Sequence, residues 1–146
     1  MRMMTAAQDI LERRARCGPR LARLRLLATP PVDESFPPAM AEDISKEISL
    51  ILAEAAAATR VVVSASGGGR RHAVAAFLDV RLARLVSAAR EVTDAAKAAD
   101  TGQLHRSVSR FDALTSAMWT VELATSGEVA VVAGRHTAAH ARTGAA

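Results

Sequence analysis

The sequence has no tyrosine and few other aromatic residues: Phe, Trp and Tyr together make up 3% of its 146 residues. Hydrophobic residues nevertheless reach 50%, so a core must be built from Leu, Val, Ile and Ala. These side chains favour closely packed helices over a β-sandwich, because Ala and Leu are strong helix formers and strands are enriched in aromatic residues. The composition predicts one all-helical domain, long enough to bury a core without disulfides or metals.

Cys17 is the one cysteine, which excludes an internal disulfide framework and is neutral about compartment. Two further absences bear on location. The N-terminal residues lack the apolar run of a secretion signal, because Asp9, Glu12 and several arginines follow Met1–Met4 closely. No uncharged apolar run approaches the length of a membrane-spanning helix. Together these features predict a cytoplasmic protein without a membrane span.

Lysine is also scarce, and the positive charge comes mainly from arginine. Heavy use of Ala and Arg is typical of GC-rich bacterial genomes, so part of the arginine excess reflects codon usage. The charge is uneven: residues 1–27 hold seven Arg and two acids, whereas residues 28–66 hold two basic residues and six acids. The net charge of +4 is therefore mostly a property of the N-terminal segment, which favours association with an anionic partner.

Apolar residues recur at alternating steps of three and four over residues 70–99, which predicts a long central helix. Its stripe consists of Leu78, Leu82, Leu85, Ala89, Val92, Ala96 and Ala99. The same periodicity predicts helices over residues 40–64 and 103–125. Short connections at the glycines of residues 67–69 and at residues 100–102 make neighbouring helices antiparallel. The predicted body, residues 40–125, is thus an up-down-up antiparallel three-helix bundle.

An additional amphipathic basic helix precedes this bundle as an arm over residues 1–27, which either docks on the bundle as a fourth helix or remains mobile. Thr5 and Gln8 have the spacing of a capping box, and Gly18-Pro19 predicts a stop after Cys17 followed by a restart. Residues 28–39 contain four prolines and read as an extended spacer. Beyond residue 125, where Ser126-Gly127 is expected to end the third helix, the sequence predicts a short helix or a disordered tail over 126–146.

Two basic segments are candidate anion-binding sites. The arm is crowded with arginines, which suit an acidic protein surface or the phosphates of a nucleic acid; they are Arg13, Arg14, Arg16, Arg20, Arg23 and Arg25. A glycine-rich loop before a helix exposes backbone N–H groups to an anion; that candidate loop consists of Gly67, Gly68, Gly69, Arg70 and Arg71. The loop lacks the Gly-Lys-Ser/Thr ending of a nucleotide-binding phosphate loop, so a simple connection is the competing interpretation.

Other polar residues give weaker signals. Glu122 falls on the apolar stripe of the third helix, and antiparallel folding sets it opposite Arg81, so we expect a buried ion pair between them. The four-residue spacing of His136 and His140 suits a metal, but no third ligand stands nearby. The arginines around Cys17 are expected to lower the pKa of its thiol, but no positioned base accompanies it, so the favoured interpretation is a half-exposed structural thiol. None of these residues forms a recognisable catalytic constellation.

Several apolar residues lie off the predicted stripes. Phe77 and Val80 are turned roughly 100° and 160° from Leu78 on the central helix, and Leu50 lies off the stripe of its own helix. Grouped exposed apolar residues favour a contact face. The leading hypothesis is a non-enzymatic helical scaffold or interaction module without cofactors, binding a second copy or a partner protein. The alternatives are a nucleic-acid-binding accessory protein and a small-ligand sensor with a pocket between helices.

Overall fold

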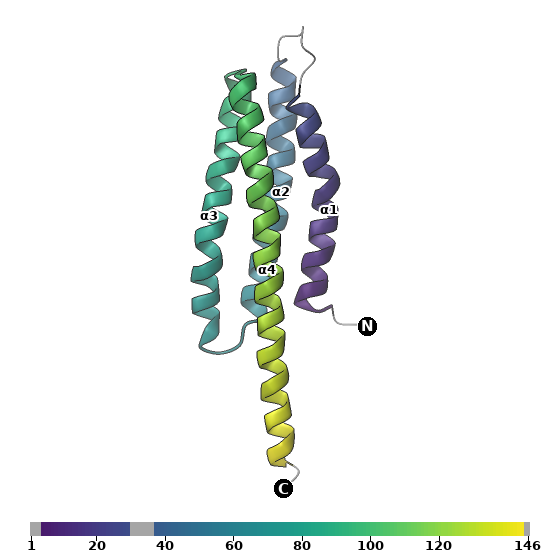
Figure 1. Cartoon of the computed structure of the whole chain (residues 1–146), viewed down its shortest axis with the longest axis vertical. Helices are drawn as coiled ribbons and strands as arrows, with labels where there is room; N and C mark the ends of the chain where they lie inside the picture. The colour runs from purple at the N-terminus through teal and green to yellow at the C-terminus, as the bar shows by residue number, and fades with distance from the viewer. Residues whose placement is uncertain (1–3, 30–36, 145–146) are drawn as a thin grey trace.

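The computed structural model describes residues 4–29 and 37–144, with the backbone alone described over 128–144. Four helices fill these ranges: α1 (Ala6–Leu27), α2 (Pro38–Ala65), α3 (Arg70–Lys97) and α4 (Thr101–Gly144). They run alternately up and down in one elongated bundle, and α4 continues well past the end of the other three (Figure 1). The prediction of an all-helical fold is confirmed for the described residues.

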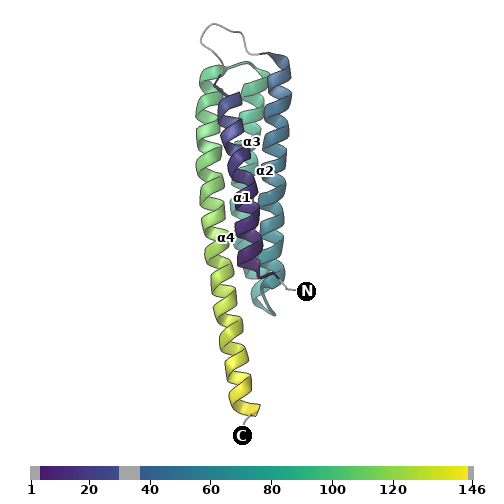
Figure 2. The ribbon, with the colours of Figure 1, turned by 90° about the vertical axis from the view of Figure 1, so that its right-hand side faces the viewer.

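The bundle consists of four helices instead of the predicted three. Each helix packs against the next, and α1 also packs against α4, which closes the ring, while α2 and α4 meet across its middle. Figure 2 shows α1 in front, between α4 and α2, with α3 behind. The N-terminal segment is therefore a helix of the bundle and not a separate arm. The predicted spacer lies largely within residues 30–36, outside the described residues.

The core follows the predicted stripes, except that Leu82 is half-buried and Ala99 is exposed beyond the end of α3. Leu78, Leu85, Ala89, Val92 and Ala96 are buried, as are Ile44, Ile48, Ile51, Ala55, Ala58 and Val62 of α2 and Leu104, Val108, Phe111, Met118 and Trp119 of α4. The helix α1 adds Ile10, Cys17, Leu21 and Leu24 to this cluster. Most of these side chains are aliphatic or small, so the helices bury their stripes against each other without large aromatic layers.

Two predicted helix ends are wrong. Helix α1 runs through Gly18 and Pro19 without a break. Both residues are exposed, so solvent can satisfy the carbonyl that loses its partner to the proline ring. Helix α4 likewise continues through Ser126 and Gly127. One interior glycine costs only about 1 kcal/mol relative to alanine, and the Ser126 hydroxyl donates to the Leu123 carbonyl within the helix.

The predicted helix start at Thr5 is confirmed. The Thr5 hydroxyl accepts a hydrogen bond from the Gln8 backbone N–H at 3.2 Å, and the Gln8 side chain accepts one from the Thr5 N–H at 3.0 Å. This reciprocal capping box satisfies two donors that a helix start leaves without partners. It fixes the first turn of α1, and with it the position of every side chain that α1 presents to the bundle and to solvent.

Candidate interaction surfaces

The arginine cluster of residues 13–25 is used largely inside the molecule. On the side facing α2, Arg13 and Arg16 reach the Glu54 carboxylate at 3.3 and 3.0 Å. Arg13 also pairs with Asp9 of its own helix, which raises the pKa of the guanidinium. These contacts join the first half of α1 to the middle of α2.

The second half of α1 continues the same pattern. Arg20 and Arg23 each lie 3.4 Å from the carboxylate of Glu47. Arg25 reaches Asp112 of α4, also at 3.4 Å. Of the three acidic residues near the start of α2, Glu42, Asp43 and Glu47, only Glu47 forms an ion pair with α1 among the described contacts. Arg14 is exposed and is the one member of the cluster without an ion pair to a described residue.

The predictions of a lowered pKa and of half exposure for Cys17 are wrong. Its side chain is fully buried in the core, and burial raises the pKa of the thiol to about 11, with a smaller raising effect from Glu54. Arg16 and Arg20 act in the lowering direction, as the sequence suggested, but desolvation outweighs them. The thiol is thus a core side chain held in its unreactive, protonated form.

The glycine loop forms a tight connection between α2 and α3. Gly68 has φ +55°, a conformation that favours glycine. The guanidinium of Arg71 donates to the Ser64 carbonyl at 3.5 Å, so it turns back onto the connection. Arg70 and Arg71 are exposed at the start of α3. Anion binding by residues 67–71 stays a prediction.

The predicted ion pair between Arg81 and Glu122 is absent from the structure. Glu122 is completely buried, and its Oε1 atom accepts a hydrogen bond of 2.8 Å from Thr59 of α2. The Arg81 guanidinium instead donates to the Phe77 carbonyl at 2.9 Å and stacks on the Phe77 ring, 3.7 Å from its centre. Antiparallel folding places both residues at one height, but Glu122 points toward α2 and Arg81 toward the surface.

Glu122 therefore lies in an apolar setting without a cation. Burial raises the pKa of its carboxyl group to about 7, against a smaller lowering effect of the Thr59 hydrogen bond. Its Oε2 atom and the Nε1 atom of Trp119, one turn earlier, are the buried side-chain atoms without a hydrogen-bond partner among the described residues. At neutral pH this carboxyl group is only partly ionised.

An apolar stripe along the outer face of α1 escaped the sequence analysis. Its large members are Leu11 and Leu26, exposed by 50 and 76%; Met4, exposed by 51%, precedes the helix. Between them the same face presents smaller exposed residues, namely Ala15, Gly18 and Ala22. A Cβ atom at Gly18 would meet nothing within 4 Å, so the fold itself does not need a glycine there. The spacing of residues 11, 15, 18, 22 and 26 is the signal in the sequence, and arginines lie between these positions along the chain.

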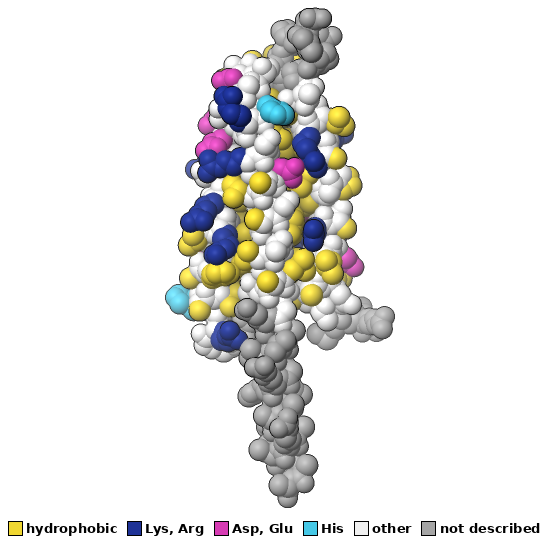
Figure 3. Space-filling model, in the orientation of Figure 1, with side chains coloured by type: hydrophobic (Ala, Val, Ile, Leu, Met, Phe, Trp, Pro, Cys, Tyr) yellow, Lys and Arg dark blue, Asp and Glu magenta, His cyan; other side chains and the backbone are white. Residues whose placement is uncertain are grey.

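A second mixed surface lies on α3. Phe77 and Val80 are exposed by 45 and 55%, as their position off the stripe predicted; Leu50 is half-buried. Arg81 and Arg84 complete a contiguous patch, because residues three and four apart are neighbours on a helix surface. Figure 3 shows Lys and Arg side chains over α3 next to hydrophobic side chains that continue onto α4.

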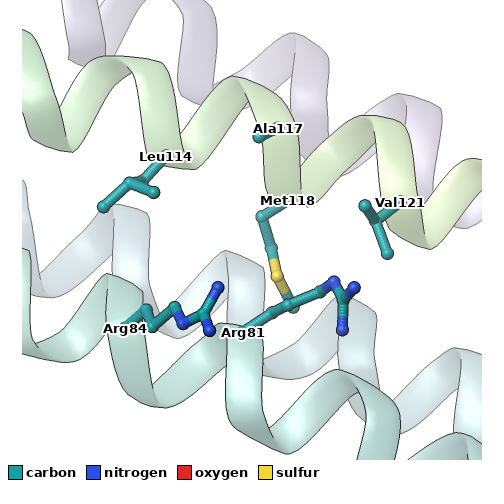
Figure 4. A pocket seen from close by; sticks show the side chains of 6 residues that line it. All are labelled: Arg81, Arg84, Leu114, Ala117, Met118 and Val121. Atoms are coloured by element: carbon teal, nitrogen blue, oxygen red, sulfur yellow. The ribbon is translucent and has the colours of Figure 1, made fainter.

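The groove between α3 and α4 borders this patch. It has a volume of about 140 Å³ and is lined by Arg81 and Arg84 on one side and by Leu114, Ala117, Met118 and Val121 on the other. Figure 4 shows the two arginines rising from α3 and Met118 extending from α4 toward them. We call this groove, together with Phe77 and Val80, the α3–α4 seam.

A larger hollow of about 650 Å³ lies where α2 begins and α3 ends. Its lining consists of Pro38, Ala41, Glu42, Ser45, Ala96, Lys97 and Ala99. Most of these residues are exposed or half-exposed, whereas small-molecule sites bury most of the ligand surface. Neither hollow has the enclosed, convergent polar lining that a ligand sensor needs.

The side chains of His136 and His140 lie outside the described residues, and no group of three metal-ligating side chains occurs among the described ones.

Comparison of the chain with protein-family models, curated proteins and solved structures found no match.

Among the described residues, α2 is long and apolar enough to cross a membrane by length and composition alone, with a mean hydropathy of 1.6 in its most apolar part. The sequence predicted no uncharged apolar run of this length, and α2 contains Glu54 and Arg60 among its apolar residues. Core helices of soluble bundles have the same properties, and the buried face of α2 packs against its three neighbours here. The helix is weak evidence on membrane association in either direction.

Proposed function

We propose that the protein is a non-enzymatic helical interaction module that self-associates through the outer face of α1. The carrying observation is the exposed stripe of Leu11 and Leu26 on α1, with the small residues Ala15, Gly18 and Ala22 between them. A helix face that is apolar on its solvent side marks a contact site more often than an inert surface.

The order of residues along the stripe supports a second copy as the occupant. Leu11 and Leu26 lie equally far from the midpoint of Gly18 and Pro19, and so do Ala15 and Ala22. Two copies of α1 packed antiparallel about a two-fold axis at this midpoint place Leu11 opposite Leu26 and Ala15 opposite Ala22. Such self-complementarity is what a two-fold symmetric dimer requires. The small residues at the centre let two helices approach closely.

The ion pairs of the arginine cluster argue against nucleic acid as the main partner. A phosphate backbone would have to compete with Glu47, Glu54 and Asp112 for the same guanidinium groups. Nucleic-acid affinity depends on the number of phosphates that basic side chains neutralise, and in this cluster only Arg14 has no described carboxylate partner. Self-association through α1 leaves the ion pairs intact.

Light scattering coupled to size-exclusion chromatography tests the proposal over a wide range of protein concentrations. We expect the mass of the wild-type protein to rise from monomer to dimer. The double variant Ala15→Glu/Ala22→Glu places like charges opposite each other at the centre of the contact and is expected to stay monomeric. The matched control Ala83→Glu/Ala113→Glu changes exposed alanines on α3 and α4 and is expected to dimerise normally.

Circular dichroism of all three proteins ensures that loss of the dimer is not loss of the fold. A wild-type protein that stays monomeric at the highest concentration contradicts self-association. A double variant that dimerises like the wild type contradicts the assignment to α1.

A further inference from the structure

The α3–α4 seam differs from the arginine cluster of α1 in that its two cations are not matched by acids. Arg81 and Arg84 form no ion pair with any described residue, unlike most arginines of α1. On the opposite wall, residues 113–121 contain no charged side chain at all. The nearest ion pair along the seam, Glu91 with Arg110 at 3.5 Å, is internally neutral.

We propose that the α3–α4 seam binds an amphipathic helix of a partner protein, one whose apolar stripe is flanked by carboxylates. This surface is separate from the outer face of α1, so the proposal goes beyond self-association. Recognition of an amphipathic helix in a groove between two helices relies on apolar anchors at one or two turns' spacing and on charges at the rim.

The geometry of the seam suits such a helix. The α4 wall presents Leu114, Ala117, Met118 and Val121 at positions i, i+3, i+4 and i+7. The α3 wall presents Phe77, Val80, Arg81 and Arg84 with the same spacing. Each set covers two turns, or about 10 Å at 1.5 Å rise per residue. The two sets lie side by side on α3 and α4, so the seam is long enough to contact about two turns of the apolar stripe of a docked helix.

The charge of the seam decides the partner's chemistry. Arg81 is held against the Phe77 ring and carbonyl, so part of the cost of ordering its side chain is already met before a carboxylate arrives. A second copy of this chain docked seam to seam would set Arg81 and Arg84 against the same arginines, which electrostatic complementarity disfavours. A nucleic acid could bind Arg81 and Arg84 through its phosphates but would make no apolar contact with the α4 side of the groove.

Fluorescence anisotropy with a synthetic peptide probe tests the proposal on the full-length protein. The probe is a fluorescein-labelled amphipathic helix with Leu along one stripe and Glu on both flanks. In the matched control peptide every Glu is replaced by Gln. We expect the Glu peptide to bind and the Gln peptide to bind on the order of tenfold more weakly. Added salt is expected to reduce the difference between the two peptides, because it screens exposed charges.

Two seam variants locate the binding site. Arg81→Glu/Arg84→Glu is expected to lose the Glu peptide and to gain binding of a third peptide with Lys on the flanks. Ala117→Glu places a charge on an exposed floor position of the groove and is expected to weaken the Glu peptide. The control Arg14→Glu/Arg60→Glu makes the same charge change at exposed arginines outside the seam and is expected to leave binding unchanged.

Three results would overturn the proposal: equal binding of the Glu and Gln peptides, undiminished binding by Arg81→Glu/Arg84→Glu, or no peptide binding at all. Vesicles containing phosphatidylglycerol form a parallel arm of the experiment, and seam-dependent binding to them in place of the peptide would assign the seam to anionic lipid. The Ala15→Glu/Ala22→Glu variant separates the two proposals. It is expected to bind the Glu peptide like the wild type whether or not the protein self-associates through α1.

Discussion

The hydroxyl group of Thr59 on α2 donates a hydrogen bond of 2.8 Å to the carboxyl group of Glu122 on α4. It is the single described polar side-chain contact across the centre of the bundle, where α2 and α4 meet. Because the rest of that environment is apolar, the protonation state of Glu122 becomes part of the energetics of folding.

Stability is expected to fall as pH rises through neutrality. Burial raises the pKa of Glu122 to about 7 from an ordinary value of 4.5, so the folded state binds this proton more tightly than the unfolded state. The favourable contribution is complete below about pH 4.5 and is lost progressively up to about pH 7. The loss in unfolding free energy is on the order of 3 kcal/mol at most. Urea unfolding of the wild type and of Glu122→Gln between pH 5 and 8 measures it.

The Gln variant is expected to lack this pH dependence and to exceed the wild type in stability at the alkaline end. Glu12→Gln, which changes an exposed carboxylate, serves as the control and should track the wild type. Parallel curves for all three proteins would show that Glu122 does not titrate in the folded state in this range.

Leu85 is 1% exposed and belongs to the same hydrophobic core cluster as Ile48 and Met118. Leu85→Ala is expected to lower the unfolding free energy by about 2–5 kcal/mol, through lost burial and a residual cavity. Chemical unfolding measures the change. Val80→Ala, on the exposed side of the same helix, is the control and should cost less than about 1 kcal/mol.

The docking of α1 is expected to depend on ionic strength. Glu47→Gln removes the shared partner of Arg20 and Arg23. Since partly exposed ion pairs contribute about 0–1 kcal/mol each, we expect a loss of roughly 1 kcal/mol at low salt that shrinks as salt is added. Glu42→Gln, an exposed residue on the same helix, is the control. An identical loss at all salt concentrations would mean that Glu47 acts by packing alone.

Alkylation of Cys17 reports whether α1 stays docked. Because its side chain is buried and its thiol pKa is raised to about 11, we expect iodoacetamide to modify the native protein far more slowly than the urea-unfolded chain at the same pH. Glu47→Gln should speed native-state modification by loosening α1. Rapid modification of the wild type would contradict the burial of Cys17.

Much of the fold follows from apolar periodicity, because stripes at steps of three and four fix which face of each helix is buried. The stripe containing Leu85 and the capping box at Thr5 were predictable for this reason. The position of α1 as a fourth helix was not, because its buried face, which includes Leu21 and Leu24, could pack against any neighbouring helix, and a segment without helical pattern separates it from α2. Periodicity says that a face is buried but does not say against which helix.

Glu122 illustrates the same limit at the level of one residue. The antiparallel hairpin gives the height of Glu122 relative to Arg81 correctly, because residues equally far from a short turn lie side by side. The hairpin does not determine in which direction around the axis of α4 the Glu122 side chain points. Since α4 contacts α1, α2 and α3, that side chain could face any of them. The contact with Thr59 depends on a parallel pairing of α2 with α4, which no local pattern encodes.

The contact between α1 and α4 also determines when α1 can be fully buried during synthesis. Of the four helices, α1 is synthesised first, but α4, one of the two helices that pack against it, is synthesised last. Arg25 has to wait for Asp112, an interval on the order of ten seconds at ordinary elongation rates. Until then the flank of α1 that belongs against α4 is open to other nascent chains. A chain truncated before α4 should therefore aggregate even though its first three helices are complete.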